Sequence, residues 1–316
     1  MNKMTQTSEN KIRIATIGYL ISDWLAAVEH FPVTPGDHQT LGEIAVEPGG
    51  MCNFLIAGQR LGGQMTALDA IGADSYGLAL LAVLEEEGVD TRGVVRVAGA
   101  RSRGVLVMSD PADQHVFMAY PGSAMPEQTF NAEWQRVLAG TDALYLDGFS
   151  LRQENVRSAA LEAAQWMACQ GKKVFFDPGP AADAGARAVL PWLDGLFLTA
   201  GELSKWAEGG VTELFGESQR LAFVVVKEGA GGCTIHAKVE PARHCQGFSV
   251  PVRDTVGAGD VFNAAFLLAL LRGSSLPECG TFANAAGAVQ VQKFGAGRNV
   301  PTRAEVEEMI EEQSKS

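Results

Sequence analysis

Three small residues followed by a carboxylate, Gly257-Ala258-Gly259-Asp260, directly precede a long apolar run and could do chemistry together. Small residues let the backbone approach a ligand, and the free N–H groups at a helix start attract negative charge. Asp260 could cap this helix, or it could take a proton from a hydroxyl group held next to a phosphoryl group. We favour the second role, because three small residues are more than a cap needs and suit a developing negative charge surrounded by amides.

The apolar run that follows predicts a helix buried on most sides. Residues 253–273 read RDTVGAGDVFNAAFLLALLRG, and Phe262, Phe266 and Ala269 fall at helical spacing beside a second apolar stripe. Two other glycine motifs are excluded. A dinucleotide fingerprint would need glycine in place of Phe262, and the loop G-x-x-x-x-G-K-[ST] does not occur. A phosphate site here therefore uses neither device.

A second glycine turn, GGMCN at residues 49–53, opens the helical sequence FLIAGQRLGG. Glycine lets a backbone approach a ligand closely, and the amide of Asn53 could reach hydroxyl groups of a polar ligand. Alternatively, Asn53 is an ordinary residue of the first helical turn. This turn is the second candidate binding element.

A carboxylate also follows the first predicted strand. The β-branched run Lys11–Ile21 predicts a buried strand of the main sheet, ended by Ser22 and Asp23. Ligands bind at the carboxyl ends of strands in open α/β sheets, so Asp23 is a candidate ligand-binding residue. A surface-loop or capping role is the alternative.

The bulk properties are typical of a globular protein with a small ligand. The 316 residues are 47% apolar and 20% charged, and a formal charge of −12 argues against nucleic acid, which needs clustered Lys and Arg. No apolar run suits a membrane span, and residues 1–10 predict a flexible tail. The cysteines are odd in number, widely spaced and without a C-x-x-C pair, so we expect reduced core or near-core thiols in a cytoplasm. They are Cys52, Cys169, Cys233, Cys245 and Cys279.

Strands and helices alternate along most of the chain, which predicts a mainly parallel sheet between helices. The expected strands are Gln64–Gly72, Ala143–Asp147, Lys173–Asp177, Gly195–Thr199 and Leu221–Glu228. The expected helices are Tyr76–Glu87, Gln153–Gln170, Ala182–Leu190, Ala200–Glu208 and Pro277–Phe294, with an acidic surface helix at Glu305–Glu312. The glycine-rich turn at residues 229–232 could lie flat against a planar group or simply end a hairpin.

Two segments break this alternation. Thr40–Val46 predicts a small strand outside the main sheet, and Gly104–Ser109 with His115–Tyr120 predicts an antiparallel hairpin. Together they would form a projecting sheet, with lid segments at about 36–48 and 100–121, that excludes water from a bound substrate. The apolar residues of this sheet exceed what one edge can hide, so we expect a homodimer through the lid.

DTVGAGD at Asp254–Asp260, together with PGGMCNFLIAGQRLG at Pro48–Gly62, resembles the two signature patterns of the ribokinase-like (PfkB) carbohydrate kinases. The resemblance extends from Lys11 to the Val300-Pro301 region. It implies one α/β domain over residues 11–316, with a three-layer α/β/α core, a mostly parallel sheet and a small projecting β-sheet lid.

The resemblance also implies an activity, which is transfer of the γ-phosphoryl group of ATP to a primary hydroxyl of a sugar or related polyol, with Mg²⁺. Asp260 would be the general base, and the amides of Gly257, Ala258 and Gly259 would form an anion hole. The substrate positions would be Asp23, Gly49, Gly50 and Asn53, and the nucleotide positions would be Lys227, Gly229, Gly232 and Asn284. Glu202 would orient Mg²⁺ through water. In many members a monovalent cation such as K⁺ lies beside the anion hole, and the matching positions are Asp254, Val256, Gln290, Lys293, Gly295 and Asn299.

The chain departs from the family pattern at three positions. Thr199 stands where the family usually has the Asn of Asn-x-x-Glu, so the handling of Mg²⁺ is altered. Lys227 stands at a frequent Thr and could meet a phosphate as a point charge. Ile21 stands where ribokinases proper commonly carry Asn, which argues against ribose itself.

The acceptor therefore stays open among ribose, fructose, a keto-deoxy sugar acid and a nucleoside. A sugar acid would need a cation near Asp23, which Arg101 or Arg103 could supply. A nucleoside would need a stacking ring, which Phe117 or Tyr120 could supply. The alternative outside the enzyme class is a non-catalytic sugar or nucleotide sensor on the same fold.

Overall fold

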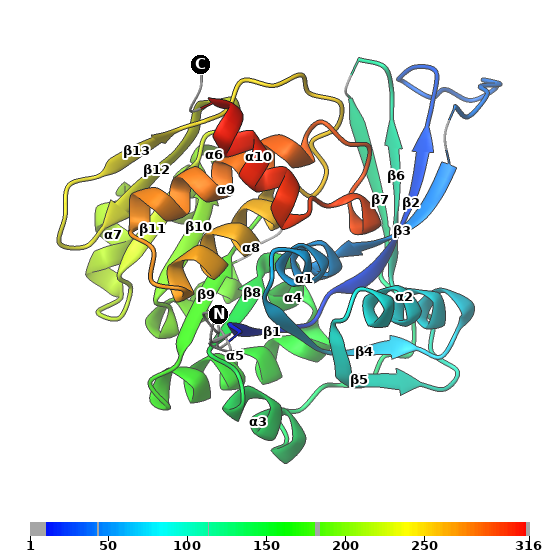
Figure 1. Cartoon of the computed structure of the whole chain (residues 1–316). Coiled ribbons are helices and arrows are strands. Elements are labelled where there is room, and N and C mark those ends of the chain that lie inside the picture. Colours follow the sequence, from blue (N-terminus) through cyan, green and yellow to red (C-terminus); the bar gives the residue numbers. More distant parts are fainter. Residues whose placement is uncertain (1–10, 43, 113, 181–183, 314–316) are drawn as a thin grey trace, which may run out of the picture.

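The main sheet has nine strands in the order β13-β12-β11-β10-β9-β8-β1-β4-β5 (Figure 1). The computed structural model describes residues 11–42, 44–112, 114–180 and 184–313, and the tail predicted at residues 1–10 lies outside them. Neighbouring strands from β11 to β5 pair in parallel, and β12 and β13 add antiparallel pairs at one edge. The strands are β1 Arg13–Ile17, β4 Gln64–Gly72, β5 Asp90–Val97, β8 Ala143–Asp147, β9 Lys173–Asp177, β10 Gly195–Thr199, β11 Phe223–Lys227, β12 Gly232–Ala237 and β13 Arg243–Gln246.

Helices cover both faces of this sheet, so the predicted three-layer fold is confirmed. One layer consists of α1 Met51–Arg60, α2 Ser75–Glu86, α8 Ala258–Leu271, α9 Leu276–Gln290 and α10 Arg303–Gln313. The opposite layer consists of α3 Ala132–Ala139, α4 Gly148–Arg152, α5 Glu154–Cys169, the 3-10 helix η1 Ala184–Trp192, α6 Ala200–Trp206 and α7 Gly210–Glu217. Two short 3-10 helices, η2 Gly229–Gly231 and η3 Gly297–Asn299, lie in loops.

Helix α8 lies deep in the first layer, as its sequence predicts. Its residues from Val261 to Ala269 are buried, and it packs between α1 and α9. Phe266 contacts two aromatic rings of the main sheet, those of Phe197 and Phe223. These contacts fix the middle of α8 against the main sheet.

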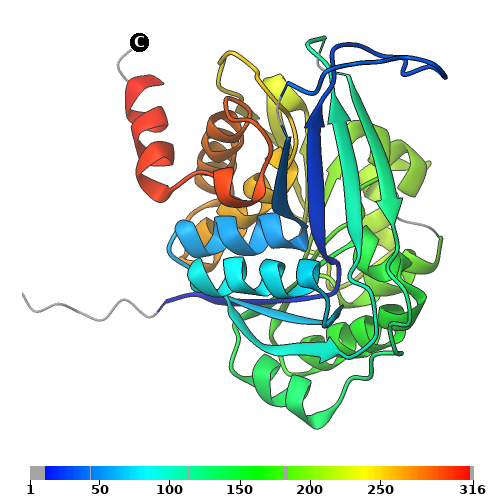
Figure 2. The same cartoon turned by 90° about the vertical axis from the view of Figure 1, so that its right-hand side faces the viewer.

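Four strands form a second sheet that projects from the main one (Figures 1 and 2). Their order is β3-β2-β6-β7, with β2 and β6 parallel and the other pairs antiparallel. The strands are β2 Leu20–Ala27, β3 Ile44–Gly50, β6 Gly104–Ser109 and β7 His115–Tyr120. We call this sheet the lid. The hairpin β6–β7 has the bounds that the sequence predicts.

The prediction of one strand over Lys11–Ile21 was wrong. Strand β1 ends at Ile17, and Gly18 and Tyr19 both adopt positive φ angles, of 82° and 55°. Such angles break a strand, because only glycine adopts them without strain. The chain then enters the lid as β2, so Asp23 lies within a lid strand and not at the end of a main-sheet strand.

The strand predicted at Thr40–Val46 starts later and runs further than expected. Strand β3 covers Ile44–Gly50, and Gly49 and Gly50 pair with Ile21 and Leu20 of β2. A Pro-Gly-Gly sequence reads locally as a turn, but β3 is an edge strand, where the missing N–H of Pro48 is tolerated. Pairing across strands therefore overrides local turn chemistry here.

Other predicted elements lie within a few residues of the observed ones, except the helix expected at Ala182–Leu190. Sequence reasoning did not foresee β5, α3, α4, α7, β12 or β13. Instead of an α-helix at Ala182–Leu190, the chain forms the 3-10 helix η1, and residues 181–183 lie outside the described part. The turn at residues 229–232 closes the antiparallel pair β11–β12, as the hairpin alternative expected.

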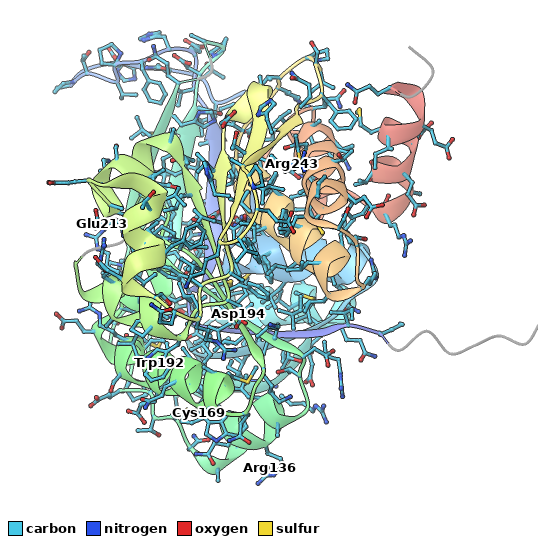
Figure 3. All side chains as sticks on the ribbon, turned by 90° about the vertical axis from the view of Figure 1, so that its left-hand side faces the viewer. Arg136, Cys169, Trp192, Asp194, Glu213 and Arg243 are labelled. Carbon is cyan, nitrogen blue, oxygen red and sulfur yellow. The ribbon has the colours of Figure 1, made fainter. Side chains whose placement is uncertain are left out.

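The cysteines are free, and four of them are buried. Cys169 is the exception to the expected core thiols, because it lies exposed at the end of α5 (Figure 3). Among the described residues, no helix combines the length and apolar character needed to cross a membrane.

A buried ion pair joins the lid to the main sheet. Arg103, directly ahead of β6, donates to Asp69 of β4 at 3.0 Å, and both side chains are almost fully buried. The same carboxylate oxygen of Asp69 accepts the N–H of Leu20, the first residue of β2. Two lid strands are thus fixed at their roots to one carboxylate of the core.

Candidate active site

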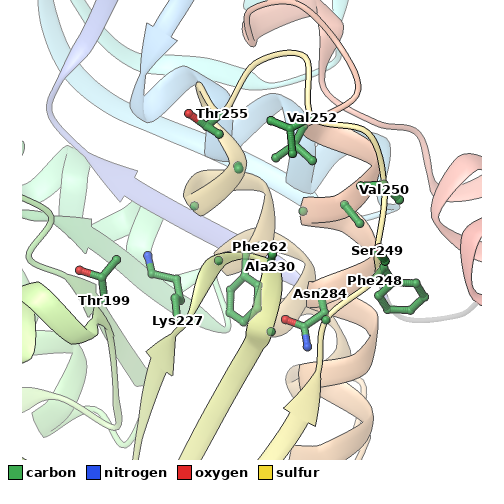
Figure 4. A pocket seen from close by; sticks show the side chains of 18 residues that line it. Thr199, Lys227, Ala230, Phe248, Ser249, Val250, Val252, Thr255, Phe262 and Asn284 are labelled. Carbon is green, nitrogen blue, oxygen red and sulfur yellow. The ribbon is translucent and has the colours of Figure 1, made fainter. Parts of the chain in front are cut away.

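A cavity of about 360 Å³ lies beside the start of α8, on the side of the β11–β12 hairpin (Figure 4). It is lined by four residues predicted to bind nucleotide, Lys227, Gly229, Gly232 and Asn284. The amide of Asn284 donates to the carbonyls of Cys245 and Gln246, so it also fixes the wall after β13. The remaining wall is mostly apolar and comes from residues 247–252 and α9.

The floor of this cavity carries one positive charge. Lys227 Nζ lies 2.5 Å from Asp177 Oδ2, and the two residues end β11 and β9, which lie on either side of β10 in the main sheet. Burial opposes the charge of Lys227, but Asp177, Glu202 and Asp260 together raise its pKa above the ordinary value. A side chain at Gly259 would touch Lys227 Nζ, since its Cβ would lie 3.4 Å away. Lys227 is therefore a fixed cation next to the helix start.

Sequence reasoning missed the residues that hold this pair. Asn263 of α8 donates to Asp177 Oδ2 at 2.6 Å and to the hydroxyl of Tyr145 at 2.9 Å. A fully buried Asn in a helix that is otherwise apolar was the available signal, because buried amides need partners.

A second cavity, of about 590 Å³, lies on the other side of the helix start, under the lid. Six residues of the predicted site line it: Asp23, Gly50, Asn53, Val256, Gly257 and Asp260. Gly49 does not line it, but a Cβ at Gly49 would lie 2.1 Å from the carboxylate of Asp23. The glycine is needed there because the Asp23 side chain occupies the space.

The two cavities meet at the turn that opens α8. Thr255 lines both of them, Ala258 and Gly259 line the first, and Gly257 and Asp260 line the second. A group passing from one cavity to the other must cross the first turn of α8.

The amides of this turn are partly free. In the described chain, the N–H groups of Gly257 and Gly259 donate to no protein acceptor, as expected for the first turn of a helix. The N–H of Ala258 makes a long bond of 3.3 Å to the carbonyl of Thr255. Gly257 has a φ of 74°, so a left-handed residue turns the chain into the helix.

Asp260 is held as a candidate base. Asn53 Nδ2 donates to Asp260 Oδ2 at 3.1 Å, and Asn53 Oδ1 accepts the N–H of Gly297. Burial raises the pKa of Asp260 to about 6, and Asp177 adds to the rise while Asn53 and Lys227 oppose it. Burial and the charge of Asp260 raise the pKa of Asp23 to about 7. Two carboxylates with pKa values near neutrality thus face one cavity.

The remaining side chains of the second cavity differ from most of those proposed from the sequence. Arg103 is sealed in its pair with Asp69, and neither Arg101 nor Tyr120 lines the cavity. Phe117 does line it, together with Arg152, His115 and the stacked rings of Tyr19 and Phe149, whose centroids are 5.0 Å apart. Arg152 follows strand β8 within a few residues, and that position was a usable signal for it.

Glu202 forms a capping box with Thr199 at the start of α6. Its carboxylate accepts the N–H of Thr199 at 2.7 Å, and the Thr199 hydroxyl accepts the N–H of Glu202. Thr199 thus supplies the cap, and its side chain lines the first cavity (Figure 4). The substitution keeps Glu202 in a defined position.

Several residues predicted to bind a monovalent cation already have partners inside the protein. Asp254 Oδ1 accepts the N–H of Val256 at 2.9 Å and Asp254 Oδ2 accepts the N–H of Gly295 at 2.7 Å. The side chain of Lys293 pairs with Glu305, and the amide of Asn299 donates to the carbonyl of Phe294. The carbonyls of Val256 and Gly295 accept from the side-chain amide of Gln290, so these residues do not form an open cage of oxygen atoms and do not fit the ion.

A three-layer α/β/α fold with a lid, and two cavities that meet at a helix start with free amides, suit transfer of a phosphoryl group between two small molecules. Residues 11–303 match a protein family described as pfkB family carbohydrate kinase. The chain belongs to this family and is an ATP-dependent sugar kinase.

Three similar proteins illustrate the relationship. Ribokinase from Haemophilus influenzae is 26% identical over 94% of this chain and 98% of its own length. Fructokinase-1 from Oryza sativa subsp. japonica is 30% identical over 84% of this chain and 88% of its own. The solved structure of a putative ribokinase II from E. coli, in complex with ATP and Mg²⁺, has a TM-score of 0.82 at 20% identity and covers 95% of this chain and 99% of its own.

Proposed function

We propose that this kinase binds ATP in the first cavity and a sugar in the second, and transfers the γ-phosphoryl group across the start of α8 to a hydroxymethyl group. The observation that carries this proposal is the meeting of the two cavities at Thr255, with Asp260 on the acceptor side. The E. coli neighbour was solved with ATP and Mg²⁺, which supports the choice of nucleotide.

Asp260 acts as the general base in this proposal. The acceptor oxygen attacks the γ-phosphorus, its proton passes to the Asp260 carboxylate, and the bond from the γ-phosphorus to the β–γ bridging oxygen breaks to release ADP. A base with a pKa of about 6 is ionised at neutral pH and still accepts a proton readily. Asn53, which donates to this carboxylate, fixes the orientation of its oxygens.

The transferring group is negatively charged, and three features of the chain match that charge. The free amides of Gly257 and Gly259 and the ammonium of Lys227 converge on the turn between the cavities. Preorganised donors of this kind stabilise charge that develops in the transition state. The amide of Ala258 is the weakest of the three predicted donors, because it already contacts Thr255.

Mg²⁺ fits the first cavity as a companion of ATP. Within the described residues no cluster of three or more His, Cys, Asp or Glu could hold a metal alone, and Mg²⁺ commonly takes one or two carboxylates plus substrate phosphates. Glu202 and Asp177 are two of the three carboxylates whose charges act on Lys227 beside the cavity, and they would hold the ion directly or through water. When bound, Mg²⁺ would neutralise charge on the phosphates.

The walls of the second cavity suit an acceptor that has hydroxyl groups at one end and an apolar face at the other. Asp23 and Asp260 supply acceptors for hydroxyl groups on the floor, while Tyr19, Phe149 and Phe117 supply an apolar wall. Ribokinase and fructokinase relatives make pentoses and ketohexoses the first candidates. The aromatic wall favours a nucleoside as the second candidate, since rings stack on planar bases.

An ADP-release assay across ribose, fructose, a keto-deoxy sugar acid and nucleosides tests the proposal, with Mg²⁺ present. We expect turnover with at least one acceptor and mass-spectrometric detection of one added phosphoryl group. Sugar binding by calorimetry without turnover for any acceptor would contradict catalysis and favour a sensor.

The lid also supplies a surface for a proposed homodimer. Its exposed apolar side chains include Ile44 (72% exposed) and Val46 on β3 and Phe117, Met118 and Tyr120 on β7. An exposed apolar edge strand is usually covered. Light scattering should give twice the chain mass, with Ile44→Lys shifting it toward the monomer; a strictly monomeric protein would contradict the dimer.

A further inference from the structure

We propose that the side-chain amide of Gln290 takes the place of a monovalent cation beside the anion hole, so that the enzyme works without K⁺. The activity test of this inference rests on the proposed function. Its thermal-unfolding test, which needs no substrate, does not.

Gln290 ends α9 and is fully buried. Its Nε2 donates to the carbonyl of Val256 at 3.1 Å and to the carbonyl of Gly295 at 2.7 Å. Both carbonyls belong to the set that would hold a cation by family resemblance. A cation that bound both oxygens would have to displace this nitrogen, because the nitrogen already lies within contact of both.

The two carbonyls flank the anion hole. Val256 directly precedes Gly257, and Ala296, which follows Gly295, packs so closely that a Cβ at Gly257 would lie 2.6 Å from its side chain. Asp254 accepts the N–H groups of Val256 and Gly295, and Gln290 donates to the carbonyls of the same two residues. Two side chains thus hold both loops together through all four backbone groups.

The orientation of the Gln290 amide follows from this network. An –NH₂ group has two donors, and both are used by the two carbonyls. The reverse orientation would bring three oxygen atoms together and would be stable only with a cation between them. In the observed orientation Oε1 is buried and has no partner, which is a cost that the two carbonyl bonds must offset.

The amide is neutral, so it supplies the positional role of a cation without the charge. Lys227 supplies a positive charge nearby, since its Nζ would lie 3.4 Å from a Cβ at Gly259. The chain therefore combines a fixed ammonium group on one side of the turn with an amide clamp on the other. Both groups are part of the chain, so neither depends on the ions in solution.

Thermal unfolding tests the clamp without any substrate. The protein is compared in KCl, NaCl and tetramethylammonium chloride at equal ionic strength, and we expect no K⁺-specific change in Tm. In Gln290→Ala, which opens the space between the two carbonyls, K⁺ should raise Tm relative to tetramethylammonium by several degrees, because a bound ligand stabilises the folded state. A K⁺-specific rise in Tm of the unchanged protein would overturn the proposal.

Activity gives the second readout, with the acceptor found by the substrate panel. The unchanged enzyme should respond to K⁺ by less than about twofold, whereas Gln290→Ala should lose roughly 10²-fold in tetramethylammonium and recover in K⁺. Gln290→Met fills the space without donors, so it should lose activity that K⁺ does not restore. Gln292→Ala, at an exposed glutamine two residues along, is the matched control. Strong K⁺ activation of the unchanged enzyme, or no K⁺ response in Gln290→Ala that folds, would contradict the clamp.

Discussion

The two cavities on either side of α8 are built in different ways. The first cavity, where we place ATP, combines turns and strand ends of the central sheet, such as Gly229, Gly232 and the end of β11 at Lys227, with an apolar wall from residues 247–252 and α9. The second cavity, where we place the acceptor, is made largely of side chains from the lid and the α4 region, such as Asp23, Phe117 and Phe149. Only the turn around Thr255 belongs to both.

This difference separates common chemistry from individual specificity. Main-chain turns and a fixed ammonium recognise phosphate, which is the same for every acceptor. Lid side chains can change one at a time without disturbing the central sheet, because the lid has a small core of its own. Substitutions on the two sides should therefore change different kinetic parameters, while those at the shared turn should change the rate itself.

The largest effect is expected at the shared turn. Asp260→Asn should lower kcat by about 10²–10⁴-fold with little change in acceptor Kd, because it removes the base and keeps the shape. Rapid kinetics and calorimetry measure the two quantities. Unchanged turnover would remove Asp260 as the base.

The same variant should also be more stable. The pKa of Asp260 is raised to about 6 from 3.8, so the folded state binds the proton more tightly than the unfolded state. The stability that this proton supplies is lost as pH rises through about 6, and the uncharged Asn does not lose it. Asp260→Asn should therefore melt higher than the unchanged protein above about pH 7, and equally near pH 4.

A change on the nucleotide side should come next in size. Lys227→Met removes the ammonium and leaves the charge of Asp177 unbalanced beside Asp260. We expect a loss of roughly 10²–10³-fold in kcat/KM for ATP, with acceptor binding retained. The exposed Lys205→Met on α6 is the matched control. Equal losses in ATP binding and in acceptor binding would argue against separate sites for the two ligands.

On the acceptor side, Gly49→Ala should act through Asp23. The added Cβ would lie 2.1 Å from the carboxylate, so Asp23 must move out of place. A misplaced binding group costs up to about 10²-fold, and we expect this in acceptor KM with ATP KM unchanged. Gly42→Ala, whose Cβ would meet only ordinary contacts at 3.7 Å, is the lid control. A selective change in ATP KM would contradict the assignment.

The smallest effect is a shift of the pH profile. Activity should fall as pH drops through about 6, since Asp260 must be ionised to accept a proton. Asn53→Ala removes a hydrogen bond to the charged form worth about 1.5 kcal/mol, so the acid limb should move up by about one pH unit. Asn155→Ala, which lines neither cavity, should leave the profile in place. A downward shift in Asn53→Ala would be opposite to the expected sign.

Sequence reasoning predicted the nucleotide side better than the acceptor side, for physical reasons. Strands β8, β9 and β10 were predicted to the residue because buried parallel strands are continuous apolar runs. The position of Asp260 was predictable because a helix start is a local feature. Local patterns therefore recover what the central sheet and its turns determine.

The acceptor side depends on contacts between residues far apart in the chain. The break at Gly18 and Tyr19 and the pairing of β3 with β2 placed Asp23 in the lid, which no local pattern required. The hydrogen bond from Asn263 to Asp177 spans 86 positions of the sequence. The stacked rings of Tyr19 and Phe149 join the turn between β1 and β2 to helix α4. Such partners become visible only once the fold has brought them together.

The ion pair between Asp69 and Arg103 fixes the lid at its root. A rotation of the lid about this point would displace the far ends of β6 and β7 most. At that far end, His115 Nε2 lies 3.3 Å from Asp254 Oδ1, the carboxylate that also orients the loops beside the helix start. Opening of the lid tip would therefore break this contact and displace the carboxylate that orients the loops next to the start of α8, whichever acceptor the lid encloses.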